Sequence, residues 1–188
     1  IFLCLISCQS DTRIVENIYS ESKDDIKNDL IINPKEAHQL MINHNDIRII
    51  QVSKKEIYQK KHLPGAYNIW RPDYGDDSEN PIKGMRASHP KIEQLLQSLD
   101  VTSETTLLLY DTKANVDAFR LAWVLDSYGF NNYKIINGGL TFWETKGFHT
   151  TEKNPVPLNK SAYTLTVKEN LENIATIKHV QLAMKDTN

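Results

Sequence analysis

The clearest pattern in the chain lies in residues 107–143, where the spacing of apolar positions changes several times. Residues 107–110 form a short apolar run that is typical of a buried strand, and the run stops at Asp111. After a polar loop, apolar residues recur with helical spacing through 116–125, and Gly129 follows as a helix-ending residue. The pattern therefore predicts a strand, a loop and a helix, with Val116 and Phe119 among the periodic apolar positions of the helix.

A second strand and a second helix follow this first pair. Tyr133, Ile135 and Ile136 predict the strand, the Asn-Gly-Gly at 137–139 predicts a turn, and residues 140–146 have the spacing of a short helix. A strand, a helix and a second strand in this order are typical of a parallel sheet with helical crossovers. The sequence therefore predicts an α/β fold whose central, mostly parallel sheet is flanked by helices. Sites in such sheets form outside the carboxyl ends of the strands, where Asp111 falls.

Two blocks of this chain resemble the signatures of the rhodanese (sulfurtransferase) family. The first is a strand ending in Tyr110, a loop that opens a helix, then Gly-Phe, a strand, Asn-Gly-Gly and Trp143. The second is the segment His-Leu-Pro-Gly-Ala at 62–66, which resembles the H-[IL]-P-G-A signature. Both blocks stand in the family's order, and with the elements before them they cover roughly residues 30–150. The resemblance implies a rhodanese-like domain over that range.

The residue at the family's catalytic position is unusual. In catalytic rhodanese domains the residue after the strand's tyrosine is the cysteine that carries the sulfane sulfur, and here it is Asp111. The resemblance is therefore to the first, non-catalytic half of tandem thiosulfate and 3-mercaptopyruvate sulfurtransferases. We expect Asp111 to cap the helix and brace the loop; the alternative is a guard over a substrate or domain interface. Arg120, in the same helix, is expected to form a structural ion pair with Asp111 or Asp117.

Upstream of these blocks, a helix and a central strand are predicted. Asn33 followed by Pro34 and Glu36 has the spacing of a capping box at a helix start. The apolar residues at positions 47, 49, 50 and 52 then predict a central strand. Where the family has an Asp-x-Arg brace, this chain has Gln-Val-Ser at 51–53, so we expect a weaker polar brace.

The signature block at 62–66 follows a short basic helix predicted at 54–61. We interpret His62 as a side chain that stabilises the turn, in preference to a catalytic base. Gly65 lies in the same turn and has the same structural role.

Residues 71–88 form the longest stretch without periodicity and predict a surface loop. Three cations in it, Arg71, Lys83 and Arg86, are candidates for a positive rim that binds a small anion. The alternative is that they are solvated charges beside the acidic residues of the same segment.

The beginning of the chain has a different composition. Residues 1–8 are apolar apart from one serine, and Leu-Ile-Ser-Cys at 5–8 is similar to the bacterial lipobox, which predicts lipidation of Cys8. The alternative is an apolar first strand whose cysteines pack or pair. Residues 9–29 are polar and charged, which favours a tether over a packed helix. The expectation is an exported protein that is lipid-anchored to a bacterial membrane.

The end of the chain also differs from the predicted domain. Residues 151–160 contain two prolines and predict a linker, and residues 173–184 have the spacing of a capped helix. This region, 151–188, resembles the linker and opening segment of a second, truncated rhodanese-like domain. We therefore expect that domain to be an intramolecular partner in a longer protein.

Composition narrows the classes of function. A net charge of −2 argues against nucleic acid as a partner. The two cysteines both lie within residues 1–8, and the six histidines have no ligand spacing, so no metal site and no cofactor is expected. The resemblance implies a small anionic sulfur compound as the substrate of the full-length protein. The first hypothesis is half of an exported tandem sulfurtransferase; the alternative is a lipid-anchored, non-catalytic binding module.

Overall fold

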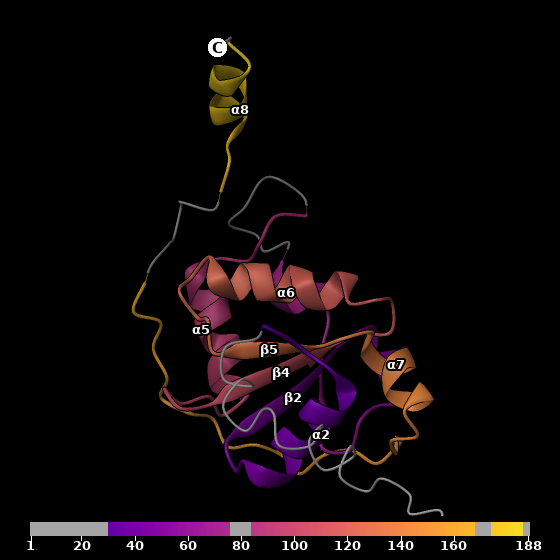
Figure 1. The fold of residues 1–188 in the computed structure, drawn as a ribbon. Coiled ribbons are helices and arrows are strands. Elements are labelled where there is room, and N and C mark those ends of the chain that lie inside the picture. The colour runs from indigo at the N-terminus through magenta and orange to yellow at the C-terminus, as the bar shows by residue number, and fades with distance from the viewer. Residues whose placement is uncertain (1–29, 76–83, 168–173, 186–188) are drawn as a thin grey trace, which may run out of the picture.

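A computed structural model describes residues 30–75, 84–167 and 174–185 of the chain. Its centre is a sheet of five parallel strands in the order β1-β5-β4-β2-β3 (Figure 1). The predicted α/β fold with a parallel sheet is thereby confirmed. The strands are β1 (Ile31–Ile32), β2 (Ile47–Val52), β3 (Tyr67–Ile69), β4 (Thr106–Tyr110) and β5 (Tyr133–Ile136).

Helices cover both faces of the sheet. Helices α5 and α6 lie on one face, and α2 lies on the other (Figure 1). Helix α4 belongs to the same side as α5 and α6, whereas α3 and α7 pack with α2. The helices are α2 (Pro34–Asn43), α3 (Lys55–Tyr58), α4 (Arg71–Tyr74), α5 (His89–Ser98), α6 (Val116–Asp126), α7 (Gly139–Thr145) and α8 (Ile177–Ala183).

The position of β4 at the centre of the sheet, with helices on both faces, explains why its sequence is an uninterrupted apolar run. Leu107 and Leu109 point into the cluster beneath α5 and α6, whereas Leu108 and Tyr110 point into the cluster beneath α2 and α7. All four are at most 1% exposed. A strand buried on both faces needs apolar side chains at every position, because successive side chains alternate between the faces.

The first helix of the chain follows its predicted cap. Asn33 accepts hydrogen bonds from the backbone N–H groups of Lys35 and Glu36, and the Glu36 carboxylate accepts one from the N–H of Asn33 at 2.7 Å. This reciprocal arrangement is a capping box, which satisfies donors that an uncapped helix start leaves without partners. The prediction for α2 is confirmed.

The predicted helix is confirmed as α6, but not all of its periodic apolar positions are buried. Val116 and Phe119 are 62% and 41% exposed. The helix instead buries a stripe that includes Ala118, Leu121 and Ala122, which packs on the sheet. The small alanine side chains carry little hydrophobic signal in the sequence, yet they allow the helix to lie close to the strands.

The two described parts of the segment 71–88, residues 71–75 and 84–88, contain a helical turn and buried side chains. The segment begins with the helical turn α4, and Tyr74 at its end is 2% exposed. Arg86 is 7% exposed and forms an isolated bridge with Gly75. The prediction of a surface loop is therefore wrong at both ends of this segment, and residues 76–83, with Lys83, lie outside the described ranges.

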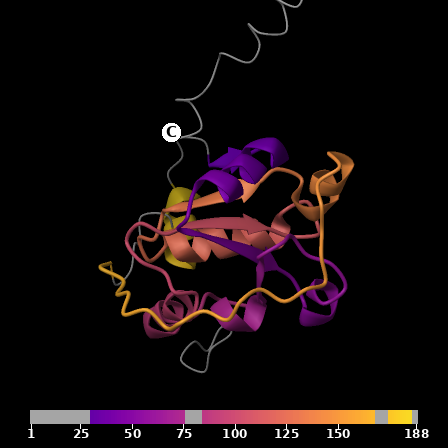
Figure 2. The same cartoon turned by 90° about the horizontal axis from the view of Figure 1, so that it is seen from below.

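The segment that follows the domain packs along its outside. We call this segment, residues 150–167, the strap; it is extended and is coloured from orange to yellow in Figure 2. Thr151 pairs with His62 through two backbone hydrogen bonds, and the side chain of Gln97 donates to the carbonyl of Tyr163 at 2.8 Å. Leu165 is buried within the α5 and α6 cluster. The predicted linker therefore lies against the domain over much of its length.

The predicted C-terminal helix is shorter than expected. It begins at Ile177, after the N-cap Thr176, and not at 173. Residues 168–173, like residues 1–29 with Cys8 and the predicted tether, lie outside the described ranges. Within the described residues, none of the helices has the length and apolar character needed to cross a bilayer.

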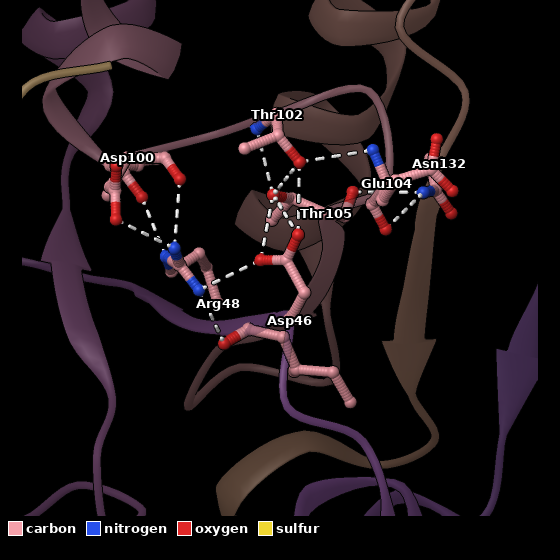
Figure 3. Close-up of polar contacts among 9 residues, drawn as sticks. Asp46, Arg48, Asp100, Thr102, Glu104, Thr105 and Asn132 are labelled. Carbon is pink, nitrogen blue, oxygen red and sulfur yellow. Dashed lines mark hydrogen bonds and ion pairs between the residues drawn. The ribbon is translucent and has the colours of Figure 1, made fainter.

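A polar cluster ties together the amino ends of three strands (Figure 3). We call this the amino-edge clasp: Asp46, Arg48, Asp100, Thr102, Thr105 and Asn132. The Asp46 carboxylate accepts from the Thr105 hydroxyl and pairs with Arg48 at 3.1 Å. Arg48 also donates to the carbonyls of Leu99 and Asp100. The clasp lies at the sheet edge opposite to the end where β4 stops at Asp111.

Candidate functional site

The candidate site is the loop between β4 and α6, residues 111–115. Asp111 immediately follows β4, at the carboxyl end where sites of parallel sheets form. Its side chain is 1% exposed. A buried carboxylate requires strong hydrogen-bonding partners, because burial removes it from water.

Four backbone N–H groups supply those partners. Oδ1 accepts from the N–H of Lys113 at 2.6 Å and of Asn115 at 2.8 Å. Oδ2 accepts from the N–H of Asp117 at 2.7 Å and of Ala118 at 3.2 Å. The last two groups belong to the first turn of α6, whose N-cap residue, Asn115, makes no side-chain capping bond. Asp111 therefore caps the helix from outside its cap position and closes the loop at the same time.

Asn115 joins this loop to the next one. Its backbone is left-handed, with a φ of 67°, and its side chain donates to the carbonyl of Ile136 at 2.6 Å. The N–H of Leu140 in turn donates to the carbonyl of Asp111 at 2.9 Å. Gly139 lies so close that a Cβ there would collide with the Asp111 carbonyl oxygen. The β4–α6 and β5–α7 loops thus form one tightly packed unit.

This arrangement is a cradle of N–H groups for an anion, and the protein's own carboxylate fills it. Converging backbone N–H groups and a helix N-terminus stabilise negative charge, whether it belongs to a ligand, a thiolate or a side chain. Asp111 satisfies the cradle without any second molecule. A carboxylate cannot carry a sulfane sulfur, so this loop lacks the group that covalent sulfur transfer requires.

The ion pair expected of Arg120 belongs to a different arginine. Arg71 donates to Oδ1 of Asp117 from Nε at 2.8 Å and from Nη2 at 2.6 Å. Arg120 instead donates to the carbonyl of Gly84 at 2.8 Å and lies over the ring of Trp123. The sequence spacing indicated proximity within α6, but the fold brings α4 closer to Asp117.

Of the three predicted rim cations, Arg86 points into the domain and does not lie on a surface rim with Arg71. The Arg86 guanidinium lies 4.6 Å from the centre of the Tyr128 ring and 3.4 Å from the Ser127 hydroxyl, inside the domain. Arg71 is at the surface in its ion pair, and Lys83 lies outside the described ranges. Sequence reasoning treated all three as surface charges because a long arginine gives no signal of burial.

His62 holds the strap to the domain. It is fully buried and stacks on the ring of Tyr58 at 4.0 Å between centroids. Nδ1 lies 2.9 Å from the carbonyl oxygen of Tyr58, and Nε2 lies 3.1 Å from that of Lys153. Gly65 has a φ of 77° in the following turn, a conformation that glycine adopts without strain.

A neutral network occupies the place of the family's charged brace. The Tyr110 hydroxyl donates to Oε1 of Gln51 at 2.7 Å and accepts from the N–H of Leu63 at 2.9 Å. Gln51 donates onward to the Ser53 hydroxyl at 3.0 Å. Burial raises the pKa of Tyr110 far above its usual range, so the hydroxyl stays protonated. The brace therefore works without charge.

Two residues of this region have roles that the sequence did not indicate. Asn115 bridges the two loops, and Tyr74 is buried with a hydroxyl that has no hydrogen-bond partner among the described residues. Neither belongs to a recognisable motif, because their roles depend on neighbours that are distant in sequence. Within the same residues, no group of three His, Cys, Asp or Glu side chains is placed to hold a metal ion.

The fold and the loop define an α/β domain with five parallel strands and an anion cradle after its central strand. The rhodanese-like domain model matches residues 33–146, and this chain belongs to that family. Solved structures agree on the fold. SseA from Escherichia coli, described as a 3-mercaptopyruvate sulfotransferase with the rhodanese fold, superposes with a TM-score of 0.70 at 20% identity. The match covers 84% of this chain and 62% of that one.

Curated relatives are similar at the level of sequence. A thiosulfate sulfurtransferase of Azotobacter vinelandii is 26% identical over 128 residues, which cover 68% of this chain and 46% of that protein. The sulfur carrier protein TtuD of Thermus thermophilus is 26% identical over 150 residues, covering 74% and 51%. The chain thus spans about half the length of these relatives.

Proposed function

We propose that this chain is the non-catalytic, N-terminal rhodanese-like half of an exported tandem sulfurtransferase. The catalytic cysteine is then in a second half that follows Asn188. The whole protein transfers sulfur from a small anionic sulfur compound of the thiosulfate or 3-mercaptopyruvate type. The observation that carries this proposal is Asp111, whose carboxylate fills the cradle that in a catalytic domain holds the sulfur-bearing cysteine.

The chemistry of sulfur transfer supports a non-catalytic role for this half. Transfer through a persulfide requires a thiolate at the mouth of the loop, where N–H groups stabilise its negative charge. Here Asp111 uses four such N–H groups. The chain's only thiols are Cys4 and Cys8, far in sequence from the loop.

The segment after the domain supports a second half. The strap ends near Val167, and α8 follows with Ile177, Val180, Leu182 and Met184 all more than half exposed. A capped helix with exposed apolar side chains is suited to packing against further protein. The half-length coverage of the curated relatives is consistent with that arrangement.

Export and membrane anchoring rest on the lipobox-like segment alone. Acylation of Cys8 would hold the protein at a bacterial membrane, and residues 9–29 would act as the tether. Full-length protein expressed in a bacterium should fractionate with membranes, and Cys8→Ser should release it. An unmodified Cys8 in the processed protein, detected by mass spectrometry, would rule out the anchor.

The alternative is a lipid-anchored binding module without a catalytic half, which the closed Asp111 cradle also favours. Sequencing the coding region beyond Asn188 distinguishes the two. The proposal predicts a further strand followed by Tyr-Cys and a short loop. A stop codon soon after Asn188 selects the binding module.

A further inference from the structure

A cleft of about 490 Å³ lies between α4 and the first turns of α6. Arg71 and Tyr74 line it from α4, and Val116, Phe119 and Arg120 line it from α6. Asp111 does not line this cleft, and its carboxylate already accepts from four backbone N–H groups. The cleft combines two cations, a buried hydroxyl and exposed apolar side chains in one small volume, which is a typical composition for a ligand site.

Tyr74 is the first indication of a missing partner. The residue is 2% exposed, and its hydroxyl has no hydrogen-bond partner among the described residues. Buried polar atoms in native proteins nearly always have partners. Burial, reinforced by the negative charge of Asp117, raises the pKa of Tyr74 to about 12, so the hydroxyl remains protonated and can donate to an anion.

Arg120 is the second indication. Its guanidinium carries five N–H groups, and the hydrogen bond to the carbonyl of Gly84 uses one N–H group, on Nη2. Among the described residues, no carboxylate forms an ion pair with it, whereas Asp117 pairs with Arg71. The cleft therefore has one arginine whose charge is paired by Asp117 and one, Arg120, that forms no ion pair with a described carboxylate.

The apolar side of the cleft is unusual for a solvent-facing helix turn. Val116 and Phe119 are 62% and 41% exposed, although Leu121, Val124 and Leu125 of the same helix are buried. These side chains therefore offer an apolar surface next to the cations. A ligand that satisfies all of these features has an anionic head and a compact apolar body.

We propose that this cleft binds a small organic oxyanion, a carboxylate or sulfonate. Its head lies between Arg71, Arg120 and the Tyr74 hydroxyl, and its apolar body rests on Val116 and Phe119. The proposal does not depend on sulfur transfer, because the cleft uses neither Asp111 nor a cysteine. It adds a second, non-covalent ligand site to the domain.

The test is a titration of the ¹⁵N-labelled 188-residue chain with benzenesulfonate at constant ionic strength. Backbone amides of residues 71, 73–75 and 116–120 should shift in a saturable manner. Arg120→Met should weaken binding at least tenfold and Tyr74→Phe several-fold, whereas the matched control Lys160→Met, on the exposed strap, should leave it unchanged. Benzyl alcohol, which has the ring without the charge, should bind at least tenfold more weakly than benzenesulfonate.

Several results would overturn the proposal. These are shifts that do not saturate, shifts centred elsewhere on the domain, equal affinity for benzyl alcohol, and equal losses from Arg120→Met and Lys160→Met. If Arg120→Met loses the dispersed spectrum of a folded protein, Tyr74→Phe decides the matter. Tyr74→Phe removes a hydroxyl without a partner and should leave the fold intact. If this variant binds benzenesulfonate as tightly as the unsubstituted chain, the proposal is contradicted.

Discussion

Replacing Asp111 with alanine removes the acceptor that four backbone N–H groups share. Three of these groups, those of Asn115, Asp117 and Ala118, are buried with the carboxylate, whereas that of Lys113 is only partly buried. Water can satisfy the last one after the substitution. The other three lose their partners inside a packed loop, so the variant should be much less stable than the loss of one ordinary cap would suggest.

The magnitude follows from the number of stranded donors. A buried donor left without a partner costs about 1–3 kcal/mol, and partial entry of water favours the lower end. Three such donors give a loss of about 3 kcal/mol in the free energy of unfolding. Asp111→Asn should lose about 2 kcal/mol, because its amide nitrogen would face N–H groups that need an acceptor.

These losses in the free energy of unfolding can be measured by urea unfolding of residues 9–188, monitored by tryptophan fluorescence. Asn33→Ala is a matched control, because Asn33 is an exposed cap on α2 that accepts only two backbone N–H groups. Its loss should be about 1 kcal/mol. If Asp111→Ala loses no more than Asn33→Ala, the carboxylate is not the brace of this loop and the account of the cradle is wrong.

Three further predictions concern stability. Arg48→Met should lose about 2 kcal/mol in the same assay, because it strands several acceptors of the amino-edge clasp (Figure 3). Gly139→Ala should lose more than Gly147→Ala, because both glycines have positive φ but only at Gly139 would the new Cβ meet backbone. Stability should be constant between about pH 8 and 10 and fall from there through pH 12, since the unfolded chain ionises its tyrosines near pH 10. In the folded protein burial raises the pKa of Tyr74 to about 12. A flat profile between pH 8 and 11.5 would contradict this last prediction.

Local patterns were sufficient to predict strands β2, β4 and β5, the parallel sheet and the cap of α2, but not the two-residue strand β1. The apolar run at 107–110 and the capping box at Asn33 are read within a few residues, and the physics that forms them is equally local. The place of Asp111 at the end of β4 followed from the same pattern. These features depend mainly on residues that are close to one another in the sequence.

Features that depend on tertiary neighbours were not predictable. The Arg71 pair with Asp117 joins residues 46 positions apart, and the burial of Arg86 depends on the Tyr128 ring. The exposure of Phe119 follows from which face of α6 meets the sheet. The number of N–H groups that donate to the Asp111 carboxylate depends on the left-handed backbone at Ala114 and Asn115. These residue types do not predict that conformation.

The most direct test of the central claim is an activity measurement on residues 9–188. The protein is incubated with thiosulfate and cyanide, or with 3-mercaptopyruvate, and is examined by mass spectrometry for a persulfide. Because Asp111 replaces the nucleophile and both cysteines are absent from this range, no turnover above buffer and no persulfide should appear. Asp111→Cys should give a reactive thiol but poor turnover. Robust turnover by the unsubstituted protein would contradict the non-catalytic assignment.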